Sequence, residues 1–75
     1  MIHSVKLLPK SSIGTRILHQ ASNPGDWIVL DQKESLSWSE REGPWLFVQP
    51  DNNSVNQKRW VSLTDDKDFF VEVLR

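Results

Sequence analysis

Gly43–Pro50 is the segment that most constrains the fold, because it is the densest apolar run in the second half of the chain and turn-forming residues bound it. A short run rich in β-branched and aromatic residues between turn signals is typical of a strand. Its apolar residues fall at consecutive positions, so both faces of such a strand would be buried. The segment therefore predicts a central strand over residues 45–49 of a β-sheet.

Further short strands, separated by turn signals, are predicted along the rest of the chain. They cover residues 4–9, 13–20, 26–31, 36–40, 58–63 and 69–74. In the second of these, one face carries Ile13, Thr15, Ile17 and His19. Three of those four residues are β-branched, so we expect this face to point toward the core.

Two local patterns set the connections between these strands. Asn23–Asp26 has Pro at its second and Gly at its third position, which favours a type II turn and a hairpin over residues 13–32. Leu36–Glu40 alternates apolar and polar residues strictly, which is typical of a half-buried strand. We expect Leu36 and Trp38 to point inward from that strand.

Length and composition favour one small domain over residues 1–75. Cysteine is absent, so neither a disulfide nor a cysteine-ligated zinc site can stabilise it. The core must then use large side chains, and four Trp and three Phe are present. No window shows a sustained helical apolar period, so no long helix is expected. The predicted fold class is all-β, a small barrel of five to seven short antiparallel strands.

Segments in both halves of the chain follow a recognisable pattern. Trp60–Leu63 reads as a penultimate strand, Thr64–Asp68 as a single 3₁₀ turn, and Phe70–Leu74 as a last strand. Gly25–Val29 is similar to a Gly-Asp-aromatic strand opening. Together these segments resemble an SH3-like barrel. The acidic, tyrosine-bearing segment with which SH3 domains bind proline-rich peptides is missing, so the resemblance implies an architecture and not the SH3 ligand.

Catalytic and metal-binding patterns are weak in this chain. His3 and His19 fall on separate predicted strands, no Ser sits in a nucleophile elbow, and there is no Gly-rich phosphate loop. Asp65, Asp66 and Asp68 lack the ligand spacing and the glycine of a calcium loop, so they indicate a capped turn with solvated acids. We therefore expect a protein that is not an enzyme and that has no cofactor and no metal.

The tryptophans are more numerous than the core of a small barrel requires. Trp27, Trp38, Trp45 and Trp60 fall on four different predicted strands. At least one should be partly exposed, where its large apolar body and single N–H donor suit an interface. Full burial and a place in a ligand groove remain open for each of them. Trp38 is the first candidate for exposure, and Trp60 is the second.

Lys58-Arg59-Trp60 supports a second function, because basic residues around an aromatic ring can bind single-stranded nucleic acid. The alternative is that Lys58 and Arg59 simply open a strand at the surface. The first 25 residues carry three basic and no acidic residues, but the net charge of −1 disfavours a strongly cationic nucleic-acid binder.

The sequence as a whole predicts a non-catalytic protein–protein binding module, such as a small accessory subunit or regulator of a bacterium or phage. The residues expected to bind the partner are Trp38, Trp45, Trp60, Arg41, Lys58 and Arg59. Single-stranded nucleic-acid binding is the alternative, and a homo-oligomer paired through the strands at residues 4–8 and 69–74 is a third. Short apolar runs and the absence of a membrane-length segment suggest a cytoplasmic location.

Overall fold

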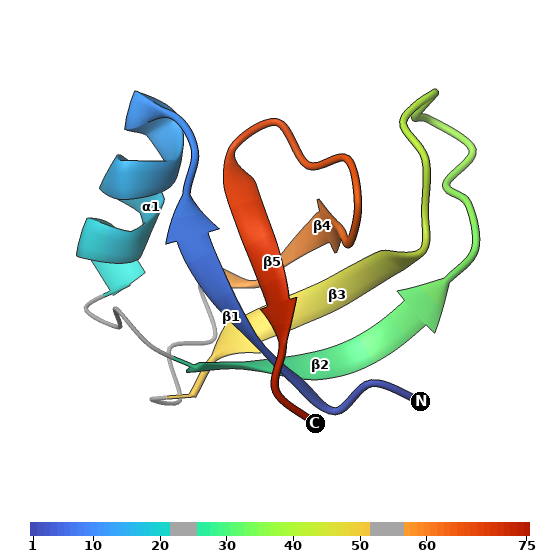
Figure 1. Ribbon diagram of the computed structural model, residues 1–75, viewed down its shortest axis with the longest axis horizontal. Coiled ribbons are helices and arrows are strands. Elements are labelled where there is room, and N and C mark those ends of the chain that lie inside the picture. Colours follow the sequence, from blue (N-terminus) through green and yellow to red (C-terminus); the bar gives the residue numbers. More distant parts are fainter. Residues whose placement is uncertain (22–25, 52–56) are drawn as a thin grey trace.

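The computed structural model describes residues 1–21, 26–51 and 57–75, which form five strands and one helix. In chain order these are β1 (Ser4–Pro9), α1 (Ser12–Ala21), β2 (Asp26–Lys33), β3 (Trp45–Pro50), β4 (Arg59–Ser62) and β5 (Phe69–Val73). The strands form one antiparallel sheet in the order β4-β3-β2-β1-β5. The sheet curls into a half-barrel with α1 beside β1 (Figure 1). The predicted all-β fold class is confirmed, with one short helix added.

β3 lies inside the sheet, between β2 and β4, as the sequence predicts. Leu46 and Val48 are fully buried on its inner face, and Trp45 is 94% buried on the other. The register between β2 and β3 shifts after Val29, which is a bulge-type irregularity. Such an irregularity bends a strand. The start of β2, Asp26–Ile28, pairs with β1, and residues from Trp27 to Lys33 pair with β3.

The first and last strands of the chain pair with each other. β1 and β5 run antiparallel over five residue pairs, from Val5 opposite Val73 to Pro9 opposite Phe69. The inner faces of the five strands and one residue of α1 supply a single core. Its members are Val5, Leu7, Ala21, Trp27, Val29, Leu46, Val48, Val61 and Phe69.

The predicted strand over residues 13–20 is wrong, because this segment forms α1. Its buried and half-buried positions are Gly14, Ile17, Leu18 and Ala21, spaced as one face of a helix. The residues expected to face the core were Ile13, Thr15, Ile17 and His19, and of these only Ile17 is partly buried. The predicted hairpin over residues 13–32 is therefore wrong as well. The first three residues of its predicted turn, Asn23–Asp26, lie outside the described residues.

Side-chain capping explains why α1 begins where it does. The Gly14 N–H donates to the Ser11 hydroxyl at 3.0 Å, and the Thr15 N–H donates to the Ser11 carbonyl at 3.0 Å. Ser11 is thus an N-cap, which satisfies one of the free donors at the helix start. The Ser11 hydroxyl donates in turn to the buried Asp68 carboxylate at 2.8 Å. The first turn of the helix is therefore fastened to the segment before β5.

Leu36–Glu40 does not form the predicted strand. The Ser39 N–H donates to the Leu36 carbonyl at 3.1 Å, which closes a turn over these four residues. Leu36 is buried as expected, whereas the Trp38 side chain is 69% exposed. Alternating apolar and polar residues do not distinguish a strand from a turn here, because neighbouring side chains point in different directions in both.

Asp66 holds the connection between β4 and β5. One carboxylate oxygen accepts from the Ser62 N–H at 3.1 Å, and the other accepts from the N–H groups of Asp68 and Phe69, each at 3.0 Å. Ser62 ends β4 and Phe69 begins β5. A turn at residues 63–65 stands where the 3₁₀ turn is expected. The Asp66 carboxylate thus links two strands that are not neighbours in the sheet.

Replacement of Gly14 by alanine should destabilise the protein by a net amount of about 1–3 kcal/mol. A Cβ atom at this position would overlap the Asp68 carbonyl oxygen, a contact that forces the helix or the loop to move. Urea unfolding followed by circular dichroism measures the change. Arg16→Ala, at an exposed position of the same helix, is the control and should stay within about 0.5 kcal/mol of the wild type. A Gly14→Ala variant as stable as the wild type would contradict this packing.

Asp66→Ala should lower the free energy of unfolding by at least about 3 kcal/mol, because it leaves three backbone N–H groups without their acceptor. Thermal and urea unfolding measure the loss. Asp65→Ala removes a neighbouring carboxylate whose partner is the exposed Arg41, so this control should cost less than about 1 kcal/mol. Equal stability of the two variants would show that Asp66 has no special part in the fold.

Candidate functional site

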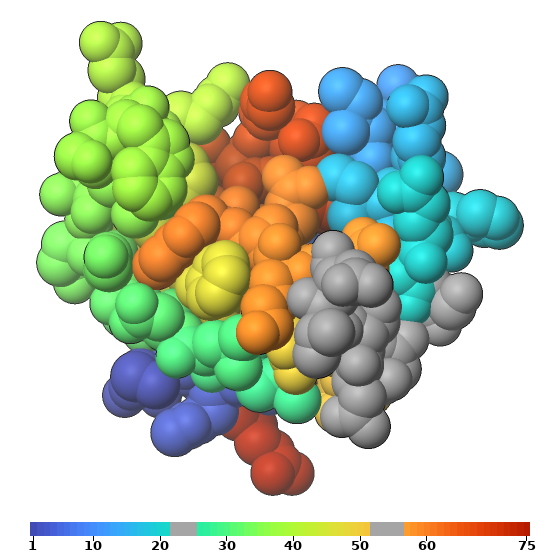
Figure 2. All heavy atoms as spheres, turned by 180° about the vertical axis from the view of Figure 1, so that it is seen from behind, coloured from blue at the N-terminus to red at the C-terminus, as the bar shows by residue number. Residues whose placement is uncertain are grey.

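A groove of about 400 Å³ opens where the connection between β2 and β3 passes β4 and the end of the β4–β5 connection. Its lining residues are Trp38, Ser39, Arg41, Trp45, Arg59, Trp60, Asp66, Lys67 and Asp68. Figure 2 views this face, on which the yellow-green segment before β3 stands beside the orange segment that contains β4. Three of the four tryptophans in the chain therefore meet at one place.

The three indoles differ in exposure according to the elements that carry them. Trp45, on β3, is 94% buried, and Trp60, on β4, is partly buried. Trp38 lies on the turn that precedes β3 and is 69% exposed, the most open of the three. Trp27 belongs to the core and is fully buried. The groove thus has an aromatic floor and one exposed indole at its rim.

Trp60 has an aromatic neighbour and a cation beside it. Its ring centroid lies 5.1 Å from that of Phe47, its partner across the β3–β4 ladder, with the planes tilted by 38°. The Lys33 ammonium lies 5.6 Å from the centroid of the Trp60 ring. Sequence reasoning missed Phe47 and Lys33. The alternation of Trp45 and Phe47 along β3 was the available signal, because alternate residues share a face of a strand.

Arg59 is half-buried, and its guanidinium turns toward the buried Asp68 carboxylate. Its guanidinium lies 3.6 Å from the Asp68 carboxylate and its Cζ lies 5.1 Å from the centroid of the Phe69 ring. Because Asp68 is buried, this ion pair is shielded from water, in contrast to a surface pair. Arg59 therefore joins β4 to the start of β5, which limits its freedom to meet a partner.

Two nitrogen donors near the groove have no acceptor. Trp45 Nε1 and Arg59 Nε are buried, and neither has a hydrogen-bond partner in the described part of the chain. Both residues line the groove. Trp27 Nε1, in the core, is a third such donor in the described part of the chain, so unpaired buried donors are not confined to the groove.

Several contacts pin the connection that carries Trp38. The Arg41 guanidinium donates to the carbonyl and the carboxylate of Asp65, at 3.2 and 3.4 Å. The Ser62 hydroxyl donates to the Glu42 carbonyl, and the Leu63 N–H donates to the Pro44 carbonyl at 3.0 Å. These bonds come from β4 and the turn after it. They hold the connection against β4, so the exposed indole stands on a supported loop.

Five of the six residues predicted to bind a partner line this groove. Trp38 and Arg41 stand at the open rim, while Trp45 and Arg59 are largely covered. Lys58 is exposed just before β4 and does not line the groove. Lys67 was missed, although it is an exposed cation on the same rim. Only the folded chain brings Lys67 beside Trp38, because 28 residues separate them in sequence.

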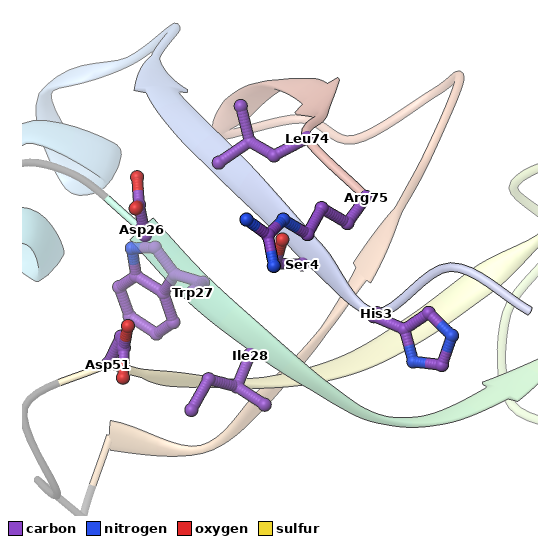
Figure 3. Close-up of a pocket in the computed structure, with 8 residues that line it drawn as sticks. All are labelled: His3, Ser4, Asp26, Trp27, Ile28, Asp51, Leu74 and Arg75. Carbon is purple, nitrogen blue, oxygen red and sulfur yellow. The ribbon is translucent and has the colours of Figure 1, made fainter.

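A second depression, of about 440 Å³, lies where both chain ends pass the start of β2. It is lined by His3, Ser4, Asp26, Trp27, Ile28, Asp51, Leu74 and Arg75. Figure 3 shows the Trp27 indole between the side chains of Asp26 and Asp51, with His3 and Arg75 farther along β1. The lining mixes acidic and basic groups, and the indole belongs to the core. This depression has no exposed aromatic anchor.

Neither a metal site nor a helix of membrane-spanning length is found among the described residues. Within residues 1–21, 26–51 and 57–75, no group of three or more His, Cys, Asp or Glu side chains is placed to hold a metal ion. No helix in these ranges has the length and apolar character to cross a bilayer. His3 and His19 lie on different elements, one before β1 and the other on α1.

Comparison with protein-family models, with curated proteins and with solved structures found no match for this chain. A small curled β-sheet does not by itself specify a ligand, because such folds carry many unrelated functions. The function must therefore be argued from the groove and its residues.

Quenching of tryptophan fluorescence by iodide should depend mainly on Trp38. Its indole is 69% exposed, whereas Trp27 and Trp45 are almost fully buried. The Trp38→Phe variant should lose most of the quenchable emission, and Trp45→Phe should lose little. Stern–Volmer plots of the four single Trp→Phe variants measure this. Undiminished quenching in Trp38→Phe would place the accessible indole elsewhere.

Proposed function

We propose that this chain is a non-catalytic protein-binding module whose partner docks on Trp38. The observation that carries the proposal is an indole, 69% exposed, on a loop that hydrogen bonds hold against β4. Trp is enriched among the residues that contribute most to protein interfaces. A supported anchor also loses little side-chain and loop entropy on binding, which favours affinity.

The remainder of the groove supports a protein partner in particular. Trp60 and Trp45 extend the apolar surface inward from Trp38, so a partner could bury an apolar side chain there. Arg41 and Lys67 stand at the rim, where charges steer an encounter more than they add affinity. An apolar centre with a polar rim is the usual composition of a protein interface.

The architecture is part of the same proposal. An antiparallel β2–β3–β4 meander, with β1 and β5 paired beside it, agrees with the SH3-like resemblance of the sequence. α1 occupies the connection between β1 and β2, and the chain has no tyrosine. These differences support a ligand other than the proline-rich peptides of SH3 domains. A small cytoplasmic accessory subunit or regulator fits this description.

Single-stranded nucleic acid is the second candidate, and one observation favours it. Trp60 offers a partly exposed ring with the Lys33 ammonium beside it, and a base could stack on such a ring. The basic triplet that suggested this function is divided, however. Arg59 turns inward to Asp68, and Lys58 lies outside the groove. The protein-binding proposal is therefore preferred.

Trp38→Ala should weaken partner binding by at least about 30-fold, the loss expected of a central interface residue. A photo-crosslinking amino acid in place of Ser39, which lines the groove, identifies the partner in cells. Calorimetry with the purified partner then gives the affinity of each variant. Phe70→Ala is the matched control, because this aromatic side chain is 57% exposed outside the groove. It should change the affinity by less than about twofold.

Two results would reject the protein-binding proposal. The first is equal affinity of wild-type and Trp38→Ala protein for the crosslinked partner. The second is binding of oligo-dT at physiological salt that quenches Trp60 emission and weakens steeply as salt rises, since phosphate contacts release counterions. In that case Lys33→Ala should weaken nucleic-acid binding and Trp38→Ala should matter less.

A further inference from the structure

β5 is an unprotected edge of the sheet. In the described part of the chain, β5 pairs with β1 on one side and no strand pairs with its other side. Proteins usually protect such edges with proline, lysine or a bulge. The sequence of β5, Phe69–Val73, has neither proline nor lysine, and its register with β1 has no irregularity.

The ladder between β1 and β5 shows which backbone groups point outward. The Leu74 N–H donates to the Ser4 carbonyl at 2.9 Å, and the Lys10 N–H donates to the Asp68 carbonyl at 2.8 Å. In an antiparallel pair, hydrogen-bonded positions alternate along each strand. The amide groups of even-numbered β5 residues therefore face β1, and those of Phe69, Val71 and Val73 face away from it. Asp66 accepts the Phe69 N–H, so the open positions are Val71 and Val73.

Exposed apolar side chains flank Glu72 along this edge. Phe70 is 57% exposed, and its partner across the ladder, Leu8, is 39% exposed on the same face. Val73 is 47% exposed at the end of the strand. An edge with free amide groups next to exposed apolar side chains is suited to adding a strand.

We propose that a second copy of this chain occupies this edge, with the two β5 strands antiparallel about a twofold axis at Val71. Charge complementarity selects this register. It places Glu72 opposite the partner's Phe70, and the Lys10 ammonium of each copy lies 5.2 Å from the centroid of its own Phe70 ring. Each Glu72, which lies opposite Lys6 of its own β1, is then also near Lys10 of the other copy, whose ammonium donates to the Asp66 carbonyl at 3.1 Å. A register shifted to centre on Glu72 would place two carboxylates opposite each other, which is destabilising.

The same register uses the open backbone groups. Val71 exchanges two hydrogen bonds with the partner's Val71, and the Val73 N–H donates to the carbonyl of the partner's Phe69. The contact is isologous, so it closes as a dimer and leaves no free copy of the same edge. It is independent of the groove around Trp38, because Val71, Glu72 and Val73 do not line that groove.

Sedimentation equilibrium of the full chain tests the dimer. The average mass should rise from 8.7 kDa toward twice that value as the concentration rises from about 10 µM to about 1 mM. Val73→Pro removes an outward N–H and leaves the ladder to β1 intact. It should weaken the dimer at least about tenfold. Val73→Thr keeps the N–H and the β-branched shape, so it should dimerise like the wild type.

A charge exchange tests the register without relying on proline. Glu72→Lys should weaken the dimer, because two cations would then meet across the interface, and Lys10→Glu should weaken it by bringing two carboxylates together. The double variant Lys10→Glu/Glu72→Lys should recover association. Circular dichroism of each variant checks that the monomer is folded.

Three outcomes would overturn the proposal. One is a wild-type protein that stays monomeric at every concentration. Another is a dimer that Val73→Pro leaves intact, since a different surface would then be responsible. The third is a double charge variant, folded as a monomer, that associates no better than either single variant.

Discussion

The Asp66 carboxylate supplies the interaction on which the remaining structure depends. β4 and β5 are the two ends of the curled sheet, and no backbone ladder joins them in the part of the chain that the structure describes. Asp66 accepts one N–H from the end of β4 and another from the start of β5, so a single side chain closes the half-barrel at this point. The ion pair of half-buried Arg59 with buried Asp68 strengthens the same junction, and the Asp68 carboxylate also accepts from Ser11, the N-cap of α1.

The aromatic residues near this junction form two groups: some fill the core, and others lie at or near the surface. Trp27 and Phe69 fill the core beneath the junction. Trp45 and Trp60 lie on the strands beside it, where Trp45 is buried and Trp60 is partly open. Trp38 projects from that connection because a turn, not a strand, carries it. An exposed indole therefore results from how the loop is tied to β4.

The open edge of β5 is another result of incomplete closure. A fully closed barrel has no edges, whereas here Asp66 satisfies only the first outward N–H of β5. The groove at Trp38 and the edge at Val71 thus have one cause. Side chains, and not a backbone ladder, join β4 to β5 at the two ends of the sheet. A partner protein and a second copy could occupy these two surfaces independently.

The sequence alone determined those strands that appear as short apolar runs between turn-forming residues. Gly43–Pro50 identified β3, and the terminal strands, β4 and the all-β class follow from the same turn-bounded apolar runs. It did not determine α1 or the Trp38 turn. Gly14 and Ala21 give α1 its buried face only because Asp68 and the core lie against them, and short segments fit both helical and strand periods. Tertiary structure alone brought Trp38, Trp60 and Lys67 together, since that proximity depends on hydrogen bonds between segments distant in the chain.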